Sequence, residues 1–261
     1  MLSASPLAQD LNAVSLLGVD YFHLKTADGS ELYLTRFGAP FREQLLPENW
    51  YEPEWFAAER TRLVGTSTIY RLPSKPVRGV SLDLVVRFSR VGEEVPMDAE
   101  SRNRNIDVEF NSPFEEFAAV MQLRAMRPRI FTKKPLAIFI PGERLQLWQT
   151  GRLESKIATK LARHPEVPLD ILRQYILLYG WIKGVNAVQA VQAVGAGAYP
   201  SHNFLSEITL KAISDLARHR FWMLDMKPEH IVLRICRDGS LLRGKGSLCY
   251  ALVDYELLEG F

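Results

Sequence analysis

Residues 224–233 read Leu-Asp-Met-Lys-Pro-Glu-His-Ile-Val-Leu and carry the most information about this 261-residue chain. An Asp-x-Lys-Pro turn leads directly into a short apolar run typical of a β-strand. Apolar residues at helical spacing predict a long helix just before it, over 204–218. A second apolar run at 250–253 ends in Asp254. The sequence thus predicts a helix, a polar loop, a hairpin and a strand that ends in a carboxylate.

The composition favours one large domain or two lobes with a proper core. Hydrophobic residues make up 47% of the chain, and 32 basic residues nearly balance 30 acidic ones. No long run of one charge sign is present, so we expect no nucleic acid partner. Polar residues such as Lys183 and Gln189 interrupt the most apolar stretch, 175–199, and no signal-peptide pattern begins the chain. We therefore expect a cytoplasmic protein without a transmembrane segment.

Hydrophobic periodicity places strands mainly in the first half of the chain and helices mainly in the second. Strands are predicted over 21–25, 31–34, 63–72 (two strands), 80–88, 130–132 and 136–140. Helices are predicted from 113 onward and over 151–163, 168–193 and 204–218. Ser112, Pro113 and Glu115 suit the N-cap, the first position and the capping-box position of the helix at 113. This order indicates an α+β fold.

The 224–233 loop resembles the catalytic loop of the protein-kinase-like superfamily, whose common form is His-Arg-Asp-Leu-Lys-Pro-Glu-Asn before an apolar strand. Asp254 and its successors resemble the superfamily's Asp-Phe-Gly turn, with Tyr255 for Phe and Glu256 for Gly. His230, in place of the usual Asn, is similar to the bacterial lipopolysaccharide sugar kinases of the superfamily. The resemblance implies an atypical bacterial-type member with a bilobal α+β fold, a strand-rich N-lobe and a shortened helical C-lobe.

The same resemblance implies a division of the chain into three parts. Residues 1–60 are expected to be an N-terminal extension that packs on the N-lobe. Residues 61–143 would form the N-lobe, with a sheet and one helix. Residues 144–261 would form a C-lobe that is truncated or minimal after Asp254.

Roles for the loop residues follow from the resemblance. Asp225 stands at the position of the catalytic base, and Lys227 at that of the cation beside the transferred phosphate. His230 and Asp254 stand at the positions of the metal ligands, which implies ATP with Mg²⁺ or Mn²⁺. Imidazole is a better ligand for Mn²⁺ than for Mg²⁺. Two alternatives stay open: an ordinary solvated Asp-x-Lys-Pro turn, and His230 packing at a strand start without metal.

In the first half, the superfamily pairs a Lys on the third strand with a Glu on the next helix, and here that strand offers Arg87. We expect Glu116 rather than Glu115 as its partner, because the capping box explains Glu115. Arg87 could instead be an exposed strand residue. The remaining nucleotide contacts are expected from a phosphate loop with a single glycine and from the strand backbone before Pro141. These residues are Gly65, Thr66, Ser67, Phe139 and Ile140.

Three functional hypotheses follow from these residues. The first is an ATP-dependent phosphotransferase that acts on a hydroxyl acceptor, either a sugar or glycolipid or a protein side chain. The second is a pseudokinase, a nucleotide-binding or scaffold module that transfers no phosphate. Arg87, His230, Glu256 and the single glycine of the phosphate loop favour it. The third is an α+β protein unrelated to kinases. A basic hairpin tip with Arg237 and Lys245 adds a minor hypothesis of peripheral contact with an anionic surface.

Overall fold

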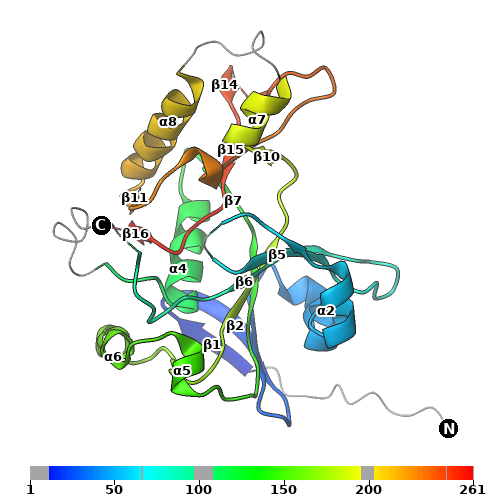
Figure 1. The fold of residues 1–261 in the computed structure, drawn as a ribbon, viewed down its shortest axis with the longest axis vertical. Coiled ribbons are helices and arrows are strands. Elements are labelled where there is room, and N and C mark those ends of the chain that lie inside the picture. Colours follow the sequence, from blue (N-terminus) through cyan, green and yellow to red (C-terminus); the bar gives the residue numbers. More distant parts are fainter. Residues whose placement is uncertain (1–11, 66, 97–107, 195–202, 245, 261) are drawn as a thin grey trace. The chain divides into compact units, whose positions relative to one another are not determined.

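The structure is a computed structural model that describes residues 12–65, 67–96, 108–194, 203–244 and 246–260 (Figure 1). The chain divides into two compact units. The first comprises residues 1–118 and 134–181, and the second comprises residues 119–133 and 182–261. The strand-rich α+β organisation expected from the sequence is confirmed.

The first unit is built on an antiparallel sheet. Within the described ranges it has eight strands in the order β1-β2-β3-β8-β9-β6-β5-β4. The strands are β1 Asn12–Leu16, β2 Val19–Lys25, β3 Glu31–Leu34, β4 Thr61–Arg62, β5 Ile69–Pro73, β6 Asp83–Phe88, β8 Pro135–Ile140 and β9 Ile176–Gly180. β6, β8 and β9 are almost wholly buried, since neighbours cover both faces.

The predicted hairpin near the N-terminus is confirmed, and it belongs to this sheet. β2 and β3 pair antiparallel from Phe22 opposite Leu34 to Lys25 opposite Glu31. β3 then pairs with β8, so residues 12–34 extend the sheet itself. The compact units therefore do not follow the boundaries expected at residues 60 and 143.

One predicted helix is wrong. The sequence favoured a helix over 168–193, but β9 occupies Ile176–Gly180 and the helix α7 begins only at Ala187. Residues 176–179 are all fully buried between β6 and β8. A strand that is buried on both faces has no period-two pattern, so its apolar run cannot be told from a buried helix by periodicity.

Strand alternation gives this sheet two different faces. One face carries the core cluster that includes Leu84, Phe139 and Leu178, and it receives Trp50 at 0% exposure. The other face carries the aromatic rings that pack on the helix α4, which spans Pro113–Ala125. The ring of Phe114 lies 5.2 Å from Tyr33, and that of Phe117 lies 5.1 Å from Tyr179. The division between the two units falls within α4, after residue 118.

Short helices complete the first unit. They are the 3₁₀ helices Ala39–Phe41 and Pro47–Asn49 and the α-helices α1 Arg42–Leu45, α2 Pro53–Glu59, α5 Leu147–Thr150 and α6 Glu154–Arg163. α5 and α6 lie in the long connection between β8 and β9. The helix predicted over 151–163 is therefore confirmed as α6.

The second unit contains a small mixed sheet in the order β10-β12-β15-β7, in which β7 runs parallel to β15. Two further strand pairs, β11 with β16 and β13 with β14, lie outside it (Figure 1). The strands are β7 Phe131–Thr132, β10 Val185–Asn186, β11 Phe221–Met223, β12 Ile231–Leu233, β13 Arg243–Gly244, β14 Ser247–Leu248, β15 Tyr250–Leu252 and β16 Leu258–Gly260. The helices that begin in this unit are α7 Ala187–Val194, α8 Phe204–Arg218 and the 3₁₀ helix Pro228–His230.

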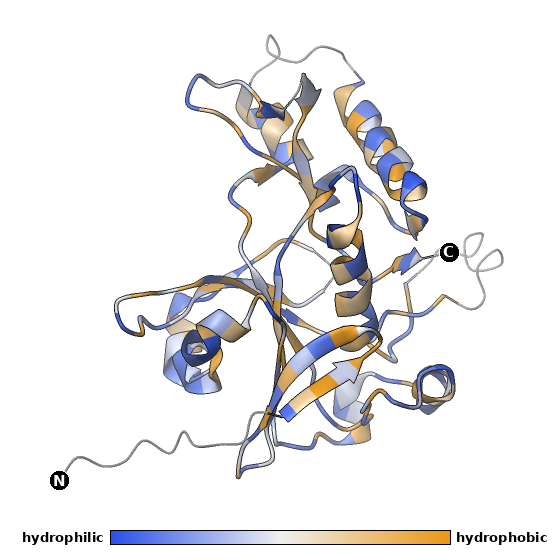
Figure 2. Ribbon diagram, turned by 180° about the vertical axis from the view of Figure 1, so that it is seen from behind, coloured by the Kyte–Doolittle hydropathy of each residue, from blue (hydrophilic) through white to orange (hydrophobic). Residues whose placement is uncertain are grey.

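The predicted helix over 204–218 is confirmed as α8. It buries Phe204, Ile208, Ala212 and Leu216 along one side, while its ribbon carries both orange and blue turns (Figure 2). None of the helices in the described part of the chain combines the length and the apolar character needed to cross a bilayer.

Candidate active site

A buried ion pair in the first unit joins Arg87 to Glu116, as the sequence predicted. The side chains are 3% and 1% exposed, so the alternative of an exposed strand arginine is excluded. Strand alternation places Arg87 with Val85 on the face that α4 covers. The hydroxyl of Tyr179 on β9 donates a further short hydrogen bond to Glu116. A cation and a hydroxyl from two neighbouring strands therefore hold the carboxylate of Glu116.

Glu115, the neighbour of Glu116, has the capping role that the sequence assigned to it. Its carboxylate accepts the backbone N–H of Ser112 at 2.7 Å, and the Ser112 hydroxyl accepts the N–H of Glu115 at 3.2 Å. Lys160 on α6 is 3% exposed and lies 3.0 Å from the same carboxylate. Burial alone would raise the pKa of Glu115, but the Lys160 ammonium and the bonds from Ser112 hold it below its usual value. The start of α4 is thereby fixed to α6.

The expected phosphate loop is only partly described. Gly65 is exposed in the turn between β4 and β5, and Ser67 is buried at 4% exposure. Thr66 lies outside the described residues. The backbone N–H of Leu63 donates to the Ile69 carbonyl at 3.0 Å and closes this turn. The role of Gly65, Thr66 and Ser67 in phosphate binding stays a prediction.

The residues of the expected adenine contact, Phe139 and Ile140, lie on β8 of the first unit. Phe139 pairs with Leu32 on one side and with Ile176 on the other, so it lies inside the sheet. The carbonyls of Ile140 and Pro141 accept hydrogen bonds from Arg173. The prediction treated 136–140 as the last strand before the second half of the chain. The last strand of the first unit is instead β9, and residues 182 onward belong to the second unit. The adenine contact itself stays a prediction.

In the second unit, Asp225, His230 and Asp254 come together, and their ligand atoms all lie within 4.8 Å of one another. The strand pairing explains this convergence. β12, which follows His230, pairs with β15, which precedes Asp254 by two residues. β16, soon after Asp254, returns to pair with β11, which ends two residues before Asp225. Two segments, the loop with Asp225 and His230 and the turn at Asp254, therefore deliver two carboxylates and an imidazole to one place.

The distances and exposures within this cluster suit a cation site. Nε2 of His230 lies 3.4 Å from Oδ2 of Asp254, and the two side chains are 11% and 19% exposed. Nδ1 of His230 is buried and has no hydrogen-bond partner among the described residues. Buried polar atoms usually have such a partner, so a hydrogen bond within the protein does not explain the position of this nitrogen. Carboxylate oxygens and imidazole nitrogen are ligands for Mn²⁺ and related divalent ions. The donor set therefore fits a divalent metal.

Lys227 is the most exposed of the predicted loop residues. Its side chain is 46% exposed, and its Nζ lies 3.5 Å from Oδ2 of Asp225. The N–H of His230 donates to the Lys227 carbonyl at 3.0 Å, which closes the 3₁₀ turn that begins at Pro228. Lys227 thus lies beside the carboxylate expected to act as base, with its ammonium accessible to a phosphate.

Two tyrosines that the sequence did not predict as site residues support these sites. Tyr179 lies in the stretch where the sequence predicts a helix. In the strand β9, Tyr179 and Leu177 point to the same face of the sheet, so a predicted strand would have placed Tyr179 on that face. From the sequence, Tyr255 is only a substitute for Phe. Its hydroxyl accepts the backbone N–H of Lys133 at 2.8 Å, a contact 122 residues apart that no local pattern reveals.

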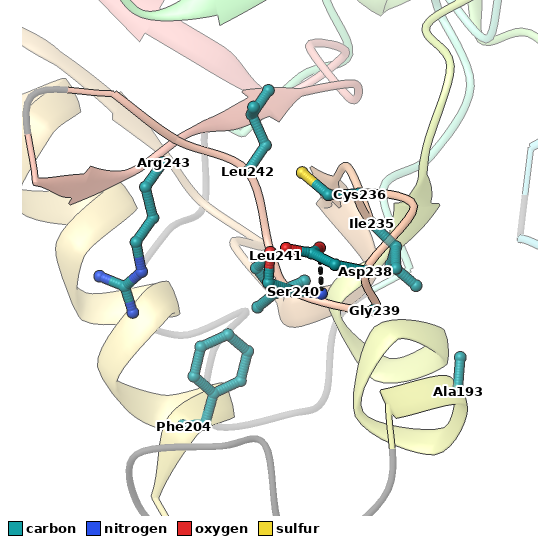
Figure 3. A pocket seen from close by; sticks show the side chains of 10 residues that line it. All are labelled: Ala193, Phe204, Ile235, Cys236, Asp238, Gly239, Ser240, Leu241, Leu242 and Arg243. Atoms are coloured by element: carbon teal, nitrogen blue, oxygen red, sulfur yellow. Dashed lines mark hydrogen bonds between the residues drawn. The ribbon is translucent and has the colours of Figure 1, made fainter.

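A separate pocket of about 680 Å³ in the second unit involves none of the predicted site residues. Phe204, Leu241 and Leu242 supply apolar lining, and Arg243 and Cys236 stand among its polar groups (Figure 3). Asp238 accepts hydrogen bonds from the backbone and the hydroxyl of Ser240 at the hairpin turn (Figure 3). These contacts stabilise the hairpin turn itself.

Comparison with known proteins finds similarity in solved structures only. No protein-family model matches the sequence, and no curated protein matches it. One similar structure is WaaP in complex with acyl carrier protein, at 11% identity and a TM-score of 0.43, covering 88% of this chain and 73% of that one. Another is WbdD with the kinase inhibitor LY294002, at 11% identity and a TM-score of 0.33, covering 77% of this chain and 33% of that one. These low scores assign no role to any residue of this chain.

Proposed function

We propose that this protein is an ATP-dependent phosphotransferase of the protein-kinase-like type that acts on a hydroxyl acceptor in the cytoplasm. The observation that carries the proposal is the convergence of Asp225, His230 and Asp254 within 4.8 Å, in the order that the catalytic-loop resemblance requires. The buried pair of Arg87 and Glu116 supports it independently, because it joins the third strand of the 61–88 meander to the next helix.

Phosphoryl transfer depends mainly on positioning and on electrostatic stabilisation. His230 and Asp254 would hold a divalent ion, which when bound neutralises phosphate charge. Asp225, partly exposed beside this pair, would accept the proton of the acceptor hydroxyl. The exposed ammonium of Lys227 would contact the transferred phosphate.

The acceptor and the metal are the finer parts of the proposal. The His230 resemblance favours a sugar or glycolipid acceptor over a protein side chain. The same residue favours Mn²⁺ over Mg²⁺, because imidazole is a softer ligand than the amide oxygen usual at this position.

The first experiment measures thermal unfolding with and without ATP and each metal. Ligand at 100 times its dissociation constant stabilises the folded protein by about 2.7 kcal/mol, so binding should raise the melting temperature clearly. Absence of any shift with ATP and either Mn²⁺ or Mg²⁺ would refute nucleotide binding.

The second experiment measures ATP hydrolysis or phosphate transfer in Asp225→Asn. We expect activity to fall by roughly 10²–10⁴-fold, the usual contribution of a general base. Asp238→Asn is the matched control, since Asp238 is an exposed aspartate of the same unit that bonds only to its own turn in the described structure. Equal activity of Asp225→Asn and the control would contradict the assigned role.

The second candidate is a pseudokinase that binds nucleotide without transfer. Glu256, in place of the usual glycine, favours it, because a buried acid stands next to the expected metal ligand. Metal-dependent stabilisation by ATP without any transfer or hydrolysis, in the wild type as in Asp225→Asn, is the result that this candidate predicts.

A further inference from the structure

Tyr255 connects the segment that carries Asp254 to the neighbouring strand β7. Its side chain is 1% exposed, and its hydroxyl accepts the backbone N–H of Lys133 at 2.8 Å. The same hydroxyl donates a short hydrogen bond to the carbonyl of Leu252. Lys133 follows β7 directly, and β7 pairs parallel with β15, which contains Leu252. One buried hydroxyl therefore joins the ends of two adjacent strands at the point where the chain turns into Asp254.

Other contacts hold the same turn. The ammonium of Lys133, a residue that is 5% exposed, lies 5.4 Å from the centroid of the Tyr255 ring, within the range of a cation–π contact. The N–H of Val253 donates to the His230 carbonyl at 3.1 Å. The N–H of Glu256 lies 3.3 Å from Oδ1 of Asp254 and donates to it. Backbone and side-chain bonds thus hold the turn both before and after Asp254.

The two departures from Asp-Phe-Gly act in the same direction. In kinases the packing of the Phe separates active from inactive arrangements, and glycine gives the turn its conformational freedom. Here Tyr255 adds a hydroxyl that is bonded twice, and Glu256, buried at 5% exposure, removes the glycine. Rotation of Tyr255 out of the core would leave the Lys133 N–H without its acceptor and would expose the ring.

We infer that Tyr255 is a positioning residue that holds Asp254 in one orientation, facing His230, whether or not a metal is bound. The inference rests on the proposed function, in which Asp254 is a metal ligand. The Asp-Phe-Gly turn of kinases switches between two arrangements, whereas the turn at Asp254 would be preorganised in one. Movement of this segment would therefore not regulate the metal site.

The test compares Mn²⁺ binding by Tyr255→Phe, by Tyr250→Phe and by the wild type. Tyr250 on β15 is the matched control, because it is also buried and its hydroxyl donates to Asp215 at 2.7 Å. Mn²⁺ alone is titrated, and the free ion is followed by electron paramagnetic resonance. We expect the dissociation constant of Tyr255→Phe to rise by about tenfold to a hundredfold, as for residues that orient metal ligands, and that of Tyr250→Phe to stay within about twofold.

The outcomes separate the inference from the proposed function. If the wild type binds no Mn²⁺, the proposed function fails at its metal site. If the wild type binds Mn²⁺ and Tyr255→Phe binds it equally well, or if both variants lose affinity equally, the inference is overturned. Melting temperatures of both variants show whether a loss of affinity exceeds a loss of stability.

A second measurement needs no variant and decides the matter even if Tyr255→Phe does not fold. Hydrogen exchange of the Lys133 amide reports directly on its bond to the Tyr255 hydroxyl. We expect strong protection that is the same within about twofold without and with Mn²⁺ or ATP, since the turn is already in place. An unprotected amide in the metal-free protein, or protection that rises about tenfold on metal addition, would show that the turn reorganises and would overturn the inference.

Discussion

Replacing Arg87 by methionine tests the buried ion pair that joins the sheet to α4. Methionine keeps an unbranched side chain of comparable length and removes the charge. The carboxylate of Glu116 is 1% exposed and would keep only the Tyr179 hydroxyl among its described polar contacts. Removing one partner of a buried pair costs about 3–5 kcal/mol, because the other charge is left in the interior. We expect that loss in the free energy of unfolding.

A second substitution shows whether the loss comes from the buried charge. In the double variant Arg87→Met with Glu116→Gln, the amide oxygen still accepts the Tyr179 hydroxyl and no charge is buried. We expect the double variant to recover most of the lost stability.

Urea denaturation followed by circular dichroism measures these free energies. Arg71→Met is the matched control, since Arg71 lies on the adjacent strand β5 and pairs with Asp83 at 2.6 Å with side chains that are 47% and 39% exposed. An exposed pair contributes about 0–1 kcal/mol, so this variant should lose little. The reasoning is refuted if Arg87→Met loses no more than Arg71→Met, or if the double variant is less stable than Arg87→Met.

Two further predictions concern the capping of α4 and the choice of metal. Because the Lys160 ammonium and bonds from Ser112 hold the pKa of Glu115 below its usual value, stability from Glu115 is present above about pH 4.3 and is lost as the pH falls below it. In Lys160→Met we expect a loss of about 2–4 kcal/mol at pH 7 and a weaker pH dependence between pH 3 and 7, measured by urea denaturation; an unchanged pH profile contradicts the assignment. In His230→Asn we expect the preference for Mn²⁺ over Mg²⁺ to fall by about tenfold in competition titrations, because an amide oxygen replaces the imidazole. An unchanged preference would mean that His230 is not a ligand.

Local features of the chain were predictable from the sequence because neighbouring residues determine them. The capping box of Ser112 and Glu115, the hairpin of β2 and β3 and the helix α8 all follow from turn chemistry or periodicity within a few residues. The choice of Glu116 as the partner of Arg87 also followed from local reasoning, since the capping box already accounted for Glu115. The order of Asp225, His230 and Asp254 along the chain is enough to identify the candidate site.

The failures occurred where burial removes the local pattern. β9 has no alternation because both of its faces are covered, so it was mistaken for a helix. The role of residues 12–34 was missed for a related reason, since no local signal tells which strand a hairpin will join.

The sequence by itself determined which residues carry the candidate chemistry, because loop composition and the order of motifs are local properties. Only the tertiary structure decided how these residues are held. The pairing of β12 with β15 and of β11 with β16 brings Asp225, His230 and Asp254 together across about 30 residues of chain. The hydroxyl of Tyr255 reaches Lys133 across 122 residues. Such contacts depend on strand register and burial throughout the unit, and these arise from packing between segments that are distant in the sequence.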